Sequence, residues 1–158
     1  LCSAGNISTT VDPIFGVGSY SSIAIGADGL TVISHFDAGA TQLRVTHCGN
    51  ALCTAGNVTH VADAPGYPVG FTPSIAIGVD GLPVISHQAD TLGALRVTHC
   101  GNAVCSSGNV STTVDDPVNR VGRHSSIAIG TDGLPVISYQ DQTARALRVI
   151  KCGTRTCQ

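Results

Sequence analysis

Short runs of aliphatic and β-branched residues, separated by turn residues, occupy most of this chain. Residues 74–78 and 82–87 are two apolar runs with an Asp-Gly dipeptide between them, which is typical of a hairpin. Residues 95–100 alternate apolar and polar side chains, as a half-buried strand does, and residues 109–114 form a fourth run. Nothing has the 3.6-residue period of an amphipathic helix, so the pattern predicts β-strands throughout.

The same pattern occurs three times along the chain. The sequence S-I-A-I-G occupies residues 22–26, 74–78 and 126–130, and each copy continues through D-G-L, L-R-V and a pair of cysteines. A fixed period of this size is typical of repeat architectures, whose units bury apolar faces against their neighbours. We therefore predict one repeat domain over residues 1–158. Its units are 22–73, 74–125 and 126–158, the last being completed by 1–21.

Four antiparallel strands in a repeat of about 50 residues are typical of a propeller blade. The unit I-A-I-G-x-D-G-L-P-V-I-S, followed by L-R-V and C-G-N, resembles bacterial extracellular β-propeller repeats of the sialidase-like, Asp-box-containing kind. The resemblance implies an all-β fold of three four-stranded antiparallel propeller-like blades. The usual Asp-box ends in Trp and the chain has none, so we expect Asp28, Asp80 and Asp132 to be hairpin-turn residues rather than calcium ligands or catalytic carboxylates.

The chain is offset by one strand from its own repeats. Its start, L-C-S-A-G-N at residues 1–6, matches residues 52–57, so it opens with a fourth strand and closes with strands one to three. That first strand would complete the last blade or a blade of a neighbouring chain. Three blades span only part of a circle. The sequence therefore allows a six-bladed ring of two chains, a segment of a longer propeller, or an open fibre.

The cysteines recur with the repeat. Cys48–Cys53, Cys100–Cys105 and Cys152–Cys157 are three C-x4-C pairs, which we predict to be disulfides, each contributing about 2 kcal/mol. Zinc is the alternative, because His47 and His99 precede two of the pairs. Cys2 is the odd cysteine, either a thiol left by truncation or a covalent link to another chain or segment. Disulfides predict an extracellular or cell-surface location.

Charge and hydropathy exclude two classes of partner. Charged residues are 11% of the chain and the formal net charge is −2, which argues against nucleic acid. No apolar run approaches the roughly 20 residues that a membrane-spanning helix needs. The chain starts at Leu1 without a signal peptide, so we expect a mature product or a piece of something longer.

The repeats differ mainly in two segments that reach one rim of a propeller. We take this rim as the candidate ligand or partner surface, and its residues are Phe15, Tyr20, His35, Phe36, Tyr67, Phe71, His87, Gln88, Arg123, His124, Tyr139 and Gln140. Such side chains suit packing between blades, contact with another protein, or a stacked sugar. His47, His60 and His99 are expected to be surface histidines.

Catalysis has little support in the sequence. A sialidase-like mechanism needs clustered arginines, an acid and a Tyr nucleophile, whereas Arg44, Arg96 and Arg148 recur once per repeat and indicate a structural role. No metal-ligand, phosphate-loop or G-x-S-x-G motif is present, and no cofactor is expected. The sequons at Asn6, Asn57 and Asn109 are either glycosylation sites or turn residues that enter a strand.

These observations predict a non-catalytic extracellular assembly module built from propeller blades. Its partner would be itself, in a ring or fibre, or the rest of a longer chain. A lectin-like glycan-binding propeller is the first alternative. A glycosidase-like enzyme is the second.

Overall fold

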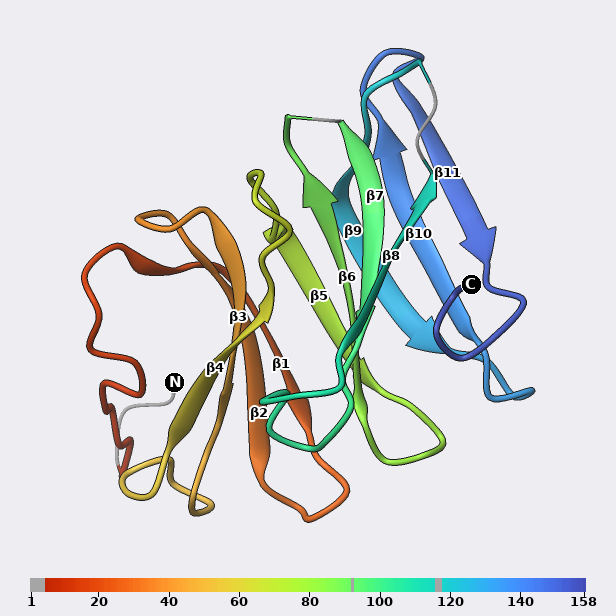
Figure 1. Cartoon of the computed structure of the whole chain (residues 1–158). Coiled ribbons are helices and arrows are strands. Elements are labelled where there is room, and N and C mark those ends of the chain that lie inside the picture. Colours follow the sequence, from red (N-terminus) through yellow and green to blue (C-terminus); the bar gives the residue numbers. More distant parts are fainter. Residues whose placement is uncertain (1–4, 92, 116–117) are drawn as a thin grey trace.

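A computed structural model describes residues 5–91, 93–115 and 118–158 (Figure 1). Within these ranges the regular elements are eleven strands in three antiparallel sheets, so the all-β prediction is confirmed. No helix long and apolar enough to cross a membrane occurs among the described residues. We call the sheets blades one, two and three in chain order.

Each blade is a meander in which consecutive strands pair. Blade one contains β1 (Val17–Ile25), β2 (Thr31–Asp37), β3 (Gln42–His47) and β4 (Val58–Asp63). Blade two contains β5 (Phe71–Ile77), β6 (Pro83–Ala89), β7 (Ala94–His99) and β8 (Val110–Asp115). Blade three contains β9 (Val121–Ile129), β10 (Pro135–Asp141) and β11 (Ala146–Lys151).

The turns between the first two strands of each blade are held by the recurring aspartates. Asp28 Oδ1 accepts a hydrogen bond from the N–H of the residue two further on at 3.0 Å, and Asp80 and Asp132 do the same at 3.2 and 3.1 Å. The intervening glycines have φ near +80°, which residues with a Cβ rarely adopt. The prediction of hairpin-turn aspartates is therefore confirmed.

All three predicted disulfides are present. Each pair has its Cα atoms 4.8 Å apart and closes the hairpin that follows the third strand. Two of the three sequon asparagines accept hydrogen bonds within the first two of these hairpins. Asn57 Oδ1 accepts from the Gly49 N–H and Asn109 Oδ1 from the Gly101 N–H, both at 3.1 Å.

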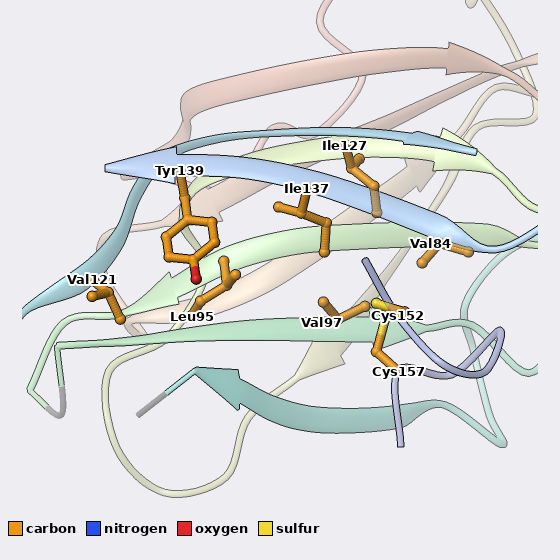
Figure 2. Close-up of a cluster of buried hydrophobic side chains, with 9 residues drawn as sticks. All are labelled: Val84, Leu95, Val97, Val121, Ile127, Ile137, Tyr139, Cys152 and Cys157. Atoms are coloured by element: carbon orange, nitrogen blue, oxygen red, sulfur yellow. A yellow bond between two sulfur atoms is a disulfide. The ribbon is translucent and has the colours of Figure 1, made fainter. Parts of the chain in front are cut away.

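The blades stack face to face along their first strands. The Ile75 N–H of β5 donates to Ser22 Oγ of β1 at 3.3 Å, and the Ile127 N–H of β9 donates to Ser74 Oγ of β5 at 3.2 Å. Apolar side chains fill each junction. Figure 2 shows the second junction, where residues of blades two and three face one another: Val84, Leu95, Val97, Val121, Ile127, Ile137, Tyr139, Cys152 and Cys157.

The offset strand does not complete the last blade of its own chain. Residues 17–21 belong to β1 of blade one, residues 5–16 form no strand, and the sheet of blade three has three strands. In Figure 1 the N-terminal segment lies beside blade one, at the opposite end of the molecule from β11. Pairing with a neighbouring chain stays a prediction. Cys2 lies outside the described residues.

Candidate functional site

The aspartate that ends blade one, and the one that ends blade two, each bind side chains of the following blade. Asp63, the last residue of β4, accepts hydrogen bonds from Arg96 of blade two, at 2.9 Å from Nε and 3.3 Å from Nη2. Its Oδ2 also lies 3.5 Å from His87 Nε2. We call this contact of an aspartate with the arginine and the neighbouring side chain of a following blade a clasp. All three side chains of the first clasp are buried, so it is shielded from water.

The clasp recurs at the second junction. Asp115 of β8 lies 3.1 Å from Arg148 Nη1, and the Tyr139 hydroxyl donates a hydrogen bond to the same carboxylate. The predicted structural role of the recurring arginines is therefore confirmed.

A third clasp exists at blade one, although the described residues contain no sheet before it. Arg44 Nε donates to Asp12 Oδ2 at 3.0 Å, and His35 Nε2 lies 3.7 Å from the same atom. Asp12 matches Asp63 and Asp115 in the repeat. The N-terminal segment therefore occupies the place of the last strand of a preceding blade, without pairing as one.

The buried histidines of the clasps are held neutral. His87 Nδ1 accepts the Gly70 N–H at 3.2 Å, which places the ring proton on Nε2, beside Thr98 Oγ1 at 3.0 Å. Burial lowers the pKa of His87 to about 4, and Asp63 only partly opposes this. Burial also lowers the pKa of His35.

Tyr139 is poorly suited to nucleophilic chemistry. Burial, together with its hydrogen bond to Asp115, raises the pKa of Tyr139 to about 12. An activated phenol would need the opposite shift. Tyr139, which the sequence placed on the candidate rim, is thus part of a structural clasp.

Two histidines that were expected on the surface are buried. His47 Nε2 lies 3.0 Å from Asp28 Oδ2, and His99 Nε2 lies 2.9 Å from Asp80 Oδ2. The exposed fractions of His47 and His99 are only 7% and 8%. The turn aspartate of the first hairpin thus lies beside each ring, a contact that the spacing in sequence does not reveal.

The zinc alternative at the cysteine pairs is not supported. The six cysteines of these pairs are joined to one another as disulfides. Among the residues that the structure describes, no group of three or more His, Cys, Asp or Glu side chains could hold a metal ion.

The predicted rim divides into a buried and an exposed set. The buried members pack between blades: His35, Phe36, His87, Gln88 and Tyr139. Phe36 stacks on the half-buried Phe71, with ring centroids 4.1 Å apart, and Arg96 Nη1 donates to the Tyr67 hydroxyl at 3.0 Å. The exposed members are Phe15, Tyr20, Arg123, His124 and Gln140. Only the exposed and half-buried residues remain accessible to a ligand or partner.

Part of this accessible set borders a polar depression. It has a volume of about 340 Å³ and is lined by Tyr20, Phe71, Thr72, Gln88, Asp90, Arg120, Arg123 and Gln142. Arg120 is paired with Asp90 at 2.7 Å. Arg123 has no ion pair with any residue that the structure describes.

The outer face of blade three, which we call the tail face, is apolar and uncovered. Leu147 and Val149 on β11 are 79% and 62% exposed. The equivalent residues of the other blades, Leu43, Val45, Leu95 and Val97, are 0% exposed because the next blade covers them. The tail face thus presents the surface that forms a junction elsewhere in the chain.

The outer face of blade one, which we call the head face, is its counterpart. Ile23 is 64% exposed, whereas the equivalent Ile75 and Ile127 are 7% and 8% exposed. A Cβ on Gly70 would lie 2.7 Å from the Leu43 Cα, so glycine allows close contact between blades. The equivalent Gly18 has the same φ of +89° but meets nothing within 4 Å.

The head face also contains an empty socket. A depression of about 260 Å³ is lined by Val11, Asp12, Val17, Gly18, Ser21, Ile33 and His35. At the first junction, the equivalents of several of these residues, including Ala62, Gly70 and Ile85, surround Leu43. The socket therefore has the lining of a site for a leucine from a preceding blade.

Comparison with known proteins shows the fold. No family model matches the sequence, and no curated protein matches it. Among solved structures the chain is similar to a novel alpha-L-arabinofuranosidase from Clostridium thermocellum, with a TM-score of 0.54 and 12% sequence identity. The alignment covers 85% of this chain and 46% of that chain. The chain thus spans about half the length of the enzyme chain, and its three antiparallel sheets match part of a propeller.

Proposed function

We propose that this chain is a non-catalytic, extracellular assembly module that associates head to tail with further copies of itself. The main support for this proposal is a contrast in burial. Leu147 is 79% exposed, whereas its equivalents Leu43 and Leu95 are fully buried under the next blade. Covering such side chains stabilises an interface by roughly 25 cal/mol per Å² of apolar surface. The three disulfides indicate an oxidising environment, which supports an extracellular location.

The partner that covers the tail face is a second copy of the chain, because the head face and the tail face are complementary. The tail face offers Leu147 as a projecting side chain, and the head face offers the socket beside Gly18. Ser126 is exposed on β9, and its equivalents Ser22 and Ser74 both accept an N–H from the following blade. A head face docked on blade three would supply the matching Ile23 N–H.

The test is the mass of the native protein in solution across a range of concentrations. We expect a dimer or a concentration-dependent series of multiples, and Leu147→Asp should reduce the association by at least tenfold. Val118→Asp is the matched control, because Val118 is fully exposed on a linker, and it should leave the masses unchanged. A monomer at every concentration, or a Leu147→Asp protein that associates like the wild type, would overturn the proposal.

A second candidate function is glycan binding at the polar depression. It is favoured by the 53% exposed ring of Tyr20, which suits stacking on a sugar, and by Arg123, which lacks an ion-pair partner among the described side chains. A glycan array with the wild type, Tyr20→Ala and Arg123→Ala tests it. Phe15→Ala is the control, because Phe15 is 98% exposed and does not line the depression. An array without hits, or equal binding by all variants, argues against this function.

A further inference from the structure

The outer edge of β11 lacks a neighbouring strand in the described structure. In blades one and two the equivalent strands, β3 and β7, pair with β4 and β8 along this edge. Blade three has the order β11-β10-β9, and β11 is its end strand. A row of unpaired N–H and C=O groups at a sheet edge is a template for another strand.

The chain carries a segment with the sequence of the missing strand. Residues 7–12, I-S-T-T-V-D, align with V-T-H-V-A-D at residues 58–63 and with V-S-T-T-V-D at residues 110–115, which are β4 and β8. Residues 7–12 form no strand, and residues 7–10 are exposed. This segment therefore has the sequence of a fourth strand but belongs to no sheet of the described structure.

One end of this segment is already held where such a partner would require it. Asp12 is bound to Arg44 of its own blade one, as Asp63 of β4 is bound to Arg96 of the following blade. When the head face of one copy covers the tail face of another, this anchor brings residues 7–12 beside β11 of the second copy. No rearrangement of the Asp12 clasp is needed.

We infer that residues 7–12 of one copy add to β11 of a second copy as the fourth strand of its blade three. This inference rests on the proposed head-to-tail association. The register follows from the pairs His47–Val58 to Leu43–Asp63 in blade one and from their counterparts in blade two. It places Ile7 opposite Lys151, Ser8 opposite Ile150, Thr9 opposite Val149, Thr10 opposite Arg148 and Asp12 opposite Leu147. Val11 is the bulge residue, as Ala62 and Val114 are in the existing ladders.

Cysteine cross-linking between two separately prepared proteins tests this register. Both carry Cys2→Ser, so that no native thiol competes. The first carries Thr9→Cys, and the second carries either Val149→Cys or, as the off-register control, Ile150→Cys. Neighbouring residues of a strand point to opposite faces, so a slip of one position separates the two thiols. Because each protein carries one new cysteine, a disulfide between the two can form only between copies.

We expect the Thr9→Cys and Val149→Cys proteins to form a covalent dimer in at least fivefold higher yield than the off-register pair. Equal yields, or no cross-link while the uncross-linked proteins still associate by mass, would overturn strand addition and leave head-to-tail association standing. A failure of all proteins to associate by mass would instead remove the proposed function on which the inference rests.

Discussion

Asp63 and Arg96 form a buried, bidentate ion pair that joins blade one to blade two, with N–O distances of 2.9 and 3.3 Å. Removing one member of such a pair leaves the other charge buried without compensation. We expect Asp63→Ala to lower the free energy of unfolding by about 3–5 kcal/mol. The matched control is Asp90→Ala, which removes the exposed pair with Arg120 and should cost less than about 1 kcal/mol. Urea unfolding measures both, and equal losses would contradict the prediction.

Acid should weaken the first junction through His87. In the unfolded chain this histidine takes a proton as the pH falls below its ordinary pKa of 6.5, whereas in the native protein it does so only near pH 4. Its contribution to stability is therefore present above pH 6.5 and is lost between about pH 6.5 and 4, with an upper bound of roughly 3 kcal/mol.

His87→Tyr should reduce that loss, because blade three already carries Tyr139 at the equivalent position and a phenol gains no proton in this range. Thermal unfolding at pH 8 checks that the tyrosine fits, since the variant should then unfold at a temperature close to that of the wild type. The same measurement at pH 6.5, 5 and 4 gives the loss of stability with falling pH for each protein. If the variant lost as much stability as the wild type over this range, His87 would not be the responsible group.

The three disulfides should differ in their contributions although they close loops of the same length. Cys100 and Cys105 are fully buried and lie in the apolar cluster between blades one and two. Replacing both by Ala should cost more than the about 2 kcal/mol of loop closure, because a cavity is added. Replacing Cys48 and Cys53 should cost less, because only Cys48 of this pair is fully buried and neither residue belongs to a junction cluster. Denaturant unfolding of the two double variants compares them, and a reversed order would contradict the prediction.

If the association is head to tail, two variants that are each damaged on a different face should still bind one another. Leu147→Asp damages the tail face and leaves the head face intact, whereas Ile23→Asp does the reverse. Each protein alone should be a monomer, and a mixture should form a one-to-one dimer that grows no further. Native mass measurement of the mixture checks this. A mixture that stays monomeric, or either variant alone forming the wild-type series, would show that the contact is of another kind.

The sequence predicts most of what is local in this fold. Hairpin turns, the C-x4-C disulfides and the positions of the strands all follow from residues that are near one another in the chain. The first strands are the exception, because β1 and β9 begin several residues before the repeated S-I-A-I-G. Their early part contains a glycine and a residue of positive φ, Tyr20 or His124, and these break the alternation that marks a strand.

Contacts between blades could not be predicted in the same way. His87 and Gln88 look like rim residues because they end a strand, yet both are buried against other strands and the following blade. The clasp between Asp63 and Arg96 joins residues 33 positions apart, and nothing in the local pattern specifies that distance. Only the recurrence of the arginine pointed to a structural role.

The unequal covering of the blades has a consequence for how the protein opens. In blade two, β6 and β7 are buried along their whole length, whereas β11 of blade three is largely exposed. Because each blade of a repeat protein is stabilised by its immediate neighbours, local opening should begin at the ends and reach the middle last. Amide protons of β7 would then exchange with solvent most slowly, because they become exposed only after the outer blades have opened.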